Sequence, residues 1–299
     1  MSDTNQIMRT AWEKNVVIPA FNIPYLPMME PVVQALVETE TFGLIEVAHI
    51  EWMKFEIESL EAVHAEYQQY KQLRCTRLHL DHIPVISEDD EPIDYVEVIS
   101  RAIDVGYESV MVDGSKLSLE ENIAATRKIT EIAHSANIAV EGELGSILRL
   151  GSGPIPPYEE LFASKQGFTD LDEAARFARE TQVDWLSVSI GNIHGSISSV
   201  TKKDKKLAAK LDIEHLAYIN QLVGIPLVLH GGSGIPKSSI QQAIQHGIAK
   251  INIGFVIRAP YESLKDSSIS KAQDAVYTTV LNVIDDLGAR GSSHLIFRE

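Results

Sequence analysis

The chain is short of cysteine, of basic residues and of long apolar runs, and each shortage excludes a class of protein. Cys75 stands alone, so no disulfide can form within the chain, which fits a reducing compartment. With 26 Lys and Arg against 42 Asp and Glu, the net charge of −16 argues against nucleic acid or an anionic membrane as the main partner. No apolar run could span a bilayer, and the first residues lack a basic, apolar leader, so we expect no signal peptide. We therefore expect a cytoplasmic protein.

Short apolar segments alternate with amphipathic helical segments from end to end of the chain. Residues 119–136 have helical spacing of apolar side chains, and Ser118 followed by two glutamates is a helix start signal. Alternation of this kind predicts a parallel sheet, and eight strand–helix units are the number that closes a barrel. We expect one TIM (β/α)8 barrel over residues 1–299, with an open doubly wound sheet as the alternative. The expected strands are 16–23, 42–50, 76–82, 109–113, 138–143, 185–191, 226–230 and 249–253.

Three polar segments interrupt the alternation, each directly after an expected strand: 83–94, 146–167 and 195–211. In a parallel barrel the loops that follow the strands form the catalytic face, so we expect these segments to lie over a site. The lysines within 202–206 are equally consistent with anion attraction and with a solvated helix face.

Three histidines, His82, His194 and His230, each end an apolar strand-like run and are each followed by a break in the pattern. A single histidine at a strand end is more often a packed core residue than a ligand. Three histidines at strand ends are stronger evidence for a metal site, because a barrel brings the carboxyl ends of distant strands to one face. Three neutral imidazoles are the usual protein contribution to an open catalytic zinc site, so the pattern predicts a metal centre.

Acidic residues accompany these histidines at the strand ends. Asp81 directly precedes His82; because successive strand side chains point to opposite sides, we expect it beside the metal as an acid/base rather than as a ligand. Asp113 closes another strand, and Glu141 and Glu143, two residues apart, should face the same side. Any one of these carboxylates could instead be paired with Lys or Arg as a structural group, since an unpaired buried charge is costly.

A glycine-rich turn, Gly231-Gly232-Ser233-Gly234, follows His230 and precedes a helix start at Pro236. Backbone N–H groups in such a turn can bind an anion. Glycine-rich turns are common, so the signal is weak alone, but the position of this turn between a candidate metal ligand and a helix start strengthens the prediction of an anion site.

Together these segments resemble the class II, zinc-dependent fructose-bisphosphate and tagatose-bisphosphate aldolases. The resemblance extends from Ala20 to about Arg258, and its motifs keep the order found in that family. The segments that carry it are Leu80-Asp81-His82, 109–115, 120–123, 140–145, Gly191-Asn192-Ile193-His194-Gly195 and 227–236. It implies a TIM barrel that forms a homodimer or homotetramer.

The resemblance also implies roles for individual residues. His82, His194 and His230 would bind one catalytic Zn²⁺, Asp81 would be the proton donor and acceptor, and Asp113 and Glu143 would offer a second metal position. A ketose phosphate and a monovalent cation would bind at the positions that match the family's substrate site. These positions are Asn22, Gly195, Gly231, Gly232, Ser233, Asn252, Gly254 and Phe255.

The segment after the eighth expected strand departs from the family pattern. Where the family usually has Asn-x-Asp-Thr-Asp, this chain has Asn252-Ile253-Gly254-Phe255-Val256, so polar phosphate contacts are replaced. The stretch after Glu143 also differs, Lys116 stands where a histidine is common, and the loop after His82 is longer. Metal and acid/base residues are kept while the substrate shell changes, which is typical of a retained reaction on an altered substrate.

We expect a zinc-dependent aldolase that reversibly cleaves a ketose (bis)phosphate or related ketose into an aldehyde and an enediolate like that of dihydroxyacetone phosphate. Fructose 1,6-bisphosphate is not favoured over tagatose bisphosphate or another ligand. One alternative is a metal-dependent sugar-phosphate epimerase or isomerase; another is a catalytically silent barrel acting as a binding or regulatory subunit. A Schiff base on a lysine such as Lys250 is a minor alternative.

Overall fold

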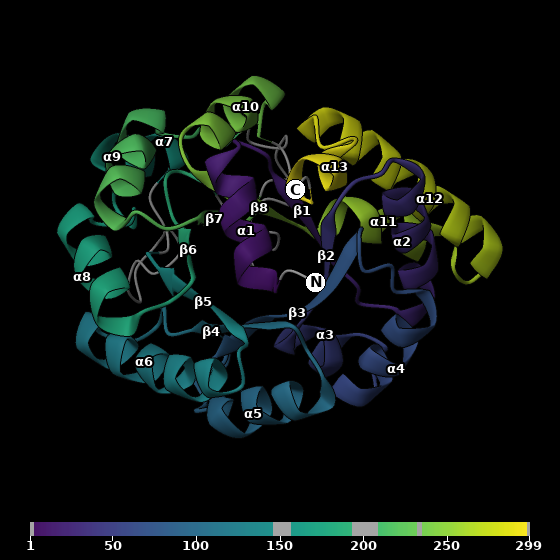
Figure 1. Ribbon diagram of the computed structural model, residues 1–299, viewed down its shortest axis with the longest axis horizontal. Helices are drawn as coiled ribbons and strands as arrows, with labels where there is room; N and C mark the ends of the chain where they lie inside the picture. The colour runs from purple at the N-terminus through teal and green to yellow at the C-terminus, as the bar shows by residue number, and fades with distance from the viewer. Residues whose placement is uncertain (1–2, 146–156, 193–208, 232–234, 298–299) are drawn as a thin grey trace.

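The computed structural model describes residues 3–145, 157–192, 209–231 and 235–297. Within them, eight parallel strands in chain order close a barrel, with the last strand paired to the first (Figure 1). The predicted TIM barrel is thereby confirmed. The strands are β1 (Ile18–Asn22), β2 (Gly43–Ala48), β3 (Thr76–Pro84), β4 (Ser109–Asp113), β5 (Ala139–Leu144), β6 (Trp185–Val188), β7 (Leu227–Leu229) and β8 (Ile248–Ile253).

Helices surround the barrel and cover its outer face (Figure 1). None of those described is long and apolar enough to cross a membrane. They are α1 (Thr4–Glu13), η1 (Leu26–Met28), α2 (Met29–Glu38), α3 (His49–Lys54), α4 (Leu60–Tyr70), α5 (Tyr95–Val105), α6 (Leu119–Ser135), α7 (Tyr158–Ser164), α8 (Leu171–Thr181), α9 (Ile213–Val223), α10 (Lys237–Gln245), α11 (Phe255–Leu264), α12 (Ile269–Leu287) and α13 (Ser292–Ile296).

Local sequence signals explain where several elements begin. Ser118 accepts a hydrogen bond from the Glu121 backbone N–H and so starts α6, as expected from the sequence. Asp170 accepts from two backbone N–H groups at the start of α8. Two boundaries differ from those expected. The strand expected over 42–50 ends at Ala48 because His49 begins α3, and α7 lies inside the expected loop 146–167.

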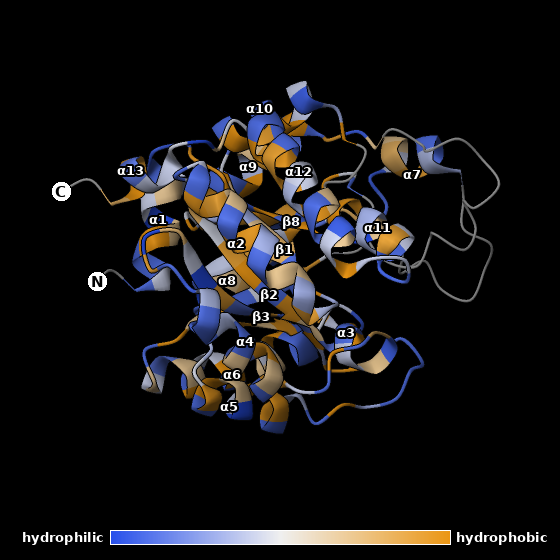
Figure 2. Ribbon diagram, turned by 90° about the vertical axis from the view of Figure 1, so that its right-hand side faces the viewer, coloured by the Kyte–Doolittle hydropathy of each residue, from blue (hydrophilic) through white to orange (hydrophobic). Residues whose placement is uncertain are grey.

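The two ends of the barrel are built differently. At the amino ends of the strands, α1 lies across the barrel (Figure 1) and buries Ile7 and Met8 against Phe42 and Trp185. Both chain termini are on this side, whereas α3, α7 and α11 lie at the opposite, carboxyl end (Figure 2). One end is therefore sealed by apolar packing, and the other carries the segments that follow the strands.

Candidate active site

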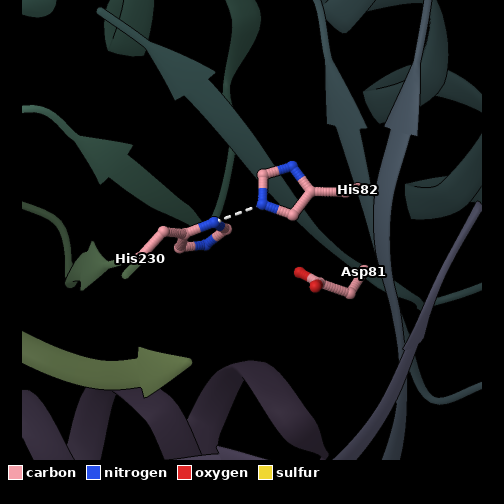
Figure 3. Close-up of side chains that lie close together, drawn as sticks. All are labelled: Asp81, His82 and His230. Atoms are coloured by element: carbon pink, nitrogen blue, oxygen red, sulfur yellow. Dashed lines mark hydrogen bonds between the residues drawn. The ribbon is translucent and has the colours of Figure 1, made fainter. Parts of the chain in front are cut away.

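Two of the three predicted histidines meet at the carboxyl end of the barrel. His82, from β3, and His230, directly after β7, face each other with His82 Nε2 and His230 Nδ1 2.5 Å apart (Figure 3). Donor atoms of Asp81, His82 and His230 all lie within 4.8 Å of one another. Residues 148 positions apart in the chain are thus brought together, as the barrel interpretation required.

The approach of Asp81 to the histidines contradicts the strand alternation assumed from the sequence. His82 has a positive φ of 35°, and the pairing of β3 with β4 shifts register between Leu80 and Ile83. Such an irregularity re-aims side chains, so Asp81 and His82 offer atoms to the same space although they are consecutive. A non-glycine residue at positive φ is strained, and strain of this kind is concentrated at functional sites.

The far side of the His230 ring is held by Glu141. His230 Nε2 lies 2.8 Å from Glu141 Oε1, and both side chains are almost fully buried. Ionised Glu141 can only accept, so His230 Nε2 carries the hydrogen and Nδ1 presents its lone pair toward His82. Metal-binding histidines commonly have this arrangement, with the second ring nitrogen bonded to a carboxylate.

The other ring nitrogen of His82 faces two acids. Nδ1 lies 3.4 Å from Glu143 Oε2 and 3.6 Å from Asp113 Oδ2, and these three residues form a second group of donors. Burial acts to lower the pKa of His82, but Asp81, Glu143 and Asp113 raise it well above its ordinary value. The three carboxylates favour a positive charge at the His82 imidazole. Either a proton on the ring or a divalent cation bound to it could provide that charge. The donor types and the charge therefore both fit a metal ion.

The carboxylate of Asp81 is held by two asparagines that the family resemblance assigned to substrate. Asn22 Nδ2 donates to Asp81 Oδ2 at 3.0 Å, and Asn252 Nδ2 donates to Oδ1 at 2.9 Å. Burial acts to raise the pKa of Asp81, but the charges of His82 and Lys250 bring it below its ordinary value. Asp81 is therefore an oriented, ionised carboxylate next to the facing imidazoles.

A buried polar cluster beneath Asp81 was not expected from the sequence. It contains Glu46, His79 and Lys250, all 0% exposed inside the barrel. His79 Nδ1 bonds to Ser109 Oγ at 2.9 Å, and burial lowers the pKa of His79 to about 3, so its ring is neutral. His79 and Asp81 lie two apart in one strand, a spacing that could have indicated a shared face. Glu46 and Lys250 are each a single charged residue within an apolar run, and this was the feature of the sequence that could have indicated buried charges.

The remaining predicted positions are divided between two groups. His194, Gly195, Gly232 and Ser233 lie outside the described residues. The others lie at the carboxyl end of the barrel: Gly231, with φ of 72°, follows His230, while Gly254 and Phe255 begin α11. Gly254 lies next to Asn22, and the Phe255 side chain is 55% exposed.

The protein is an α/β barrel whose imidazole and carboxylate donors are gathered at the carboxyl ends of its strands. The chain belongs to the family of fructose-bisphosphate aldolases, class II, whose family model matches residues 2–292.

Two curated proteins and one solved structure that are similar to this chain are also named as aldolases. The 6-phospho-5-dehydro-2-deoxy-D-gluconate aldolases of Shouchella clausii and Halalkalibacterium halodurans are both 36% identical to it, over 57% and 59% of this chain. The matches cover 53% and 52% of those proteins, so the chain spans about half the length of the curated relatives it matches. The crystal structure of the YdjI aldolase from Escherichia coli K12 has a TM-score of 0.74 and 26% identity, covering 98% of this chain and 99% of that one.

Proposed function

We propose that the protein is a metal-dependent aldolase that reversibly cleaves a ketose (bis)phosphate, or a related ketose, by a retro-aldol step. The observation that carries this proposal is the pair of facing nitrogens, His82 Nε2 and His230 Nδ1, beside the Asp81 carboxylate. We propose Zn²⁺ as the ion and His194 as the third imidazole, because three histidines with one open position are a usual catalytic zinc set. Family membership supports the reaction type.

Retro-aldol cleavage of a β-hydroxy ketone needs a base for the hydroxyl proton and a sink for the charge left next to the carbonyl. A divalent ion held by His82 and His230 would supply that sink as a Lewis acid. Asp81 accepts the hydroxyl proton while the carbon–carbon bond breaks and the aldehyde leaves, and it returns the proton in condensation. Asn22 and Asn252 keep the carboxylate aimed at this proton through their hydrogen bonds to its two oxygens.

We propose one catalytic ion rather than two. Asp113 and Glu143 lie close enough to His82 Nδ1 to form a second metal position, but that position would need the same imidazole to bind metal through both nitrogens. A neutral imidazole has one lone pair for a ligand, and its other nitrogen carries a hydrogen. The two acids therefore act as acceptors that leave His82 Nε2 for the ion.

The substrate phosphate is proposed to bind near Gly231 and the start of α11. The first backbone N–H groups of a helix have no partner within it and favour an anion, and Gly254 brings this helix start next to Asn22. A monovalent cation is proposed for the same region. The relatives' name makes 6-phospho-5-dehydro-2-deoxy-D-gluconate one substrate to test, beside fructose and tagatose bisphosphates.

Lys250 does not suit a Schiff-base mechanism. Its ammonium is fully buried and lies 2.8 Å from Glu141 Oε2 and 3.2 Å from Glu46 Oε2. Burial acts to lower the pKa of Lys250, but the carboxylates raise it above its ordinary value, so the amine keeps its proton and is no nucleophile.

The proposed function is tested by measuring triose release from these ketose phosphates before and after treatment with a chelator. We expect release that stops on metal removal and returns with Zn²⁺, and no inactivation by borohydride in the presence of substrate. Release that persists in the metal-free protein would contradict the proposal. Interconversion of ketoses without trioses would favour an epimerase or isomerase, and protein that neither binds Zn²⁺ nor turns over would favour a silent barrel.

We also propose that the protein works in the cytoplasm, in keeping with its single cysteine, and that it forms a homodimer or homotetramer, as the family resemblance implies. Light scattering of the purified protein tests this assembly directly, and a monomer mass would contradict it.

A further inference from the structure

Lys250 has no part in the mechanism above, yet it lies in the middle of the charged interior. Its Nζ is 2.8 Å from Glu141 Oε2, 3.2 Å from Glu46 Oε2 and 3.9 Å from Asp81 Oδ1. All four side chains are at most 2% exposed. A buried ammonium is costly unless it is paired, and a buried carboxylate left without its partner is destabilising as well. We therefore asked which of its neighbours the buried ammonium of Lys250 holds in place.

Glu141 connects Lys250 to the proposed metal site, because its two oxygens serve opposite neighbours. Oε2 accepts from Lys250 Nζ at 2.8 Å and from Trp185 Nε1 at 2.6 Å, while Oε1 faces His230 Nε2 at 2.8 Å. The carboxylate is thus fixed in its plane by donors on one side and offers its other oxygen to the imidazole. Without the ammonium, Oε2 would keep the indole N–H and, among the described residues, the more distant His79 Nε2 at 3.5 Å, so Glu141 would be held less firmly against His230.

We propose that Lys250 is a positioning residue that acts through Glu141 on His230. The contacts from Lys250 to Glu141 and from Glu141 to His230 hold the His230 imidazole in the tautomer with hydrogen on Nε2. They direct its Nδ1 lone pair toward His82 Nε2. This inference rests on the proposed metal site, and it gives the buried lysine a task other than covalent catalysis. Partners of this outer kind orient metal-binding histidines and raise metal affinity.

Glu46 lies on the other side of the ammonium and differs from Glu141 in its contacts. Among the described residues, neither of its oxygens has a hydrogen bond of good geometry, and burial, with Asp81 second, raises its pKa well above the ordinary value. Glu46 therefore competes weakly for Lys250, which leaves the ammonium to Glu141 and Asp81. Glu46→Gln keeps the shape of the side chain and makes it permanently uncharged.

The test is a double-mutant cycle on Zn²⁺ affinity, measured by competition with a chelator. We expect Lys250→Met and Glu141→Gln each to weaken binding by about 10–100-fold, the range found for outer partners of metal ligands. If Lys250 acts through Glu141, the double variant should bind no more weakly than Glu141→Gln alone. Lys128→Met, the same change at an exposed position of α6, is the matched control and should bind like the wild type.

Wild-type affinity in Lys250→Met, or losses that multiply in the double variant, would overturn the proposal. If Lys250→Met does not fold, the same comparison is made between Glu46→Gln with Lys250→Met and Glu46→Gln alone, since the pair removes the ammonium without leaving a titratable carboxyl at position 46.

A second measurement separates this inference from the proposed function. Nitrogen-15 NMR of the His230 ring in metal-free protein reports which nitrogen carries the hydrogen. We expect the Nε2–H tautomer in the wild type and a mixture in Lys250→Met. An unchanged tautomer in that variant would refute the positioning role whether or not the wild type binds metal.

Discussion

The interior of the barrel is apolar at its amino end and charged at its carboxyl end, although the same strands build both. In β1 the inward side chains pass from Ile18 and Ala20 to Asn22; in β5 they pass from Ala139 to Glu141 and Glu143. Because inward positions recur every second residue, each strand can supply packing at one end and chemistry at the other. Residues that stabilise the fold and residues proposed for catalysis therefore lie at opposite ends of the same strands.

The energetic consequences of the two ends differ in kind. At the amino end, α1 closes the barrel by burying apolar area, which stabilises the fold in proportion to the area removed from water (Figure 1). At the carboxyl end, several carboxylates share the interior with Lys250, and each must be paired or neutral to be tolerated. Substitutions at the two ends should therefore separate folding from catalysis.

The largest effect should come from Asp81→Ala at the carboxyl end. Removing the proposed proton acceptor should lower turnover by about 10²–10⁴-fold, the usual contribution of a general acid/base. Metal content should stay near that of the wild type, because all three proposed imidazole ligands remain. Turnover and bound zinc are measured on the same preparation, and a variant that has lost its zinc would show that Asp81 is a ligand instead.

At the amino end, Met8→Ala should produce the opposite result. Met8 is 0% exposed within the cluster beneath the barrel, so its truncation should lower the free energy of unfolding by about 2–5 kcal/mol. Denaturant unfolding measures this loss, and kcat of the folded protein should be unchanged. A large fall in kcat without loss of stability would break the division between the two ends.

Glu51→Gln should change how the free energy of unfolding depends on pH. Glu51 is buried at the carboxyl end, where it accepts from the Ala48 N–H at 2.8 Å, and burial raises its pKa from 4.5 to about 8. The folded state then binds this proton more tightly than the unfolded chain does, so the free energy of unfolding should fall as pH rises from 4.5 to about 8.

The contribution of Glu51 to that fall should be at most about 5 kcal/mol, the equivalent of this rise in pKa. Unfolding curves at several pH values should therefore be flatter for Glu51→Gln than for the wild type. Equal pH slopes in the two proteins would show that Glu51 is ionised in the fold.

The smallest effect is expected at the rim of the carboxyl end. Phe255 is 55% exposed at the start of α11 and cannot hydrogen-bond an anion through its side chain. Phe255→Thr should lower KM several-fold, roughly 1 kcal/mol for one hydrogen bond, for a substrate whose phosphate reaches this helix start. The matched control is a substrate without that phosphate, whose KM should not change; an unchanged KM for both would remove Phe255 as the cause of the altered substrate shell.

Much of the fold was accessible from the sequence because helix starts and apolar runs are local signals. The expected strand 109–113 and the helix after Asp170 agree with β4 and α8. The convergence of His82 and His230 was also predictable, since parallel strands of a closed barrel present their carboxyl ends together.

The features of the site that could not be predicted from the sequence depend on the geometry between distant residues. The register shift in β3 that brings Asp81 and His82 to one space has no local sequence signature. The pairing of Lys250 with Glu141 and Glu46 likewise requires knowing which strands are neighbours across the barrel interior. Single charged residues inside apolar strands mark such pairings only in retrospect.

Anomalous diffraction at the zinc edge, from crystals grown with Zn²⁺, tests most directly whether imidazoles from separate strands bind one divalent ion. We expect a single strong peak within bonding distance of His82 Nε2 and His230 Nδ1. No peak between these rings in protein that turns over substrate would contradict it.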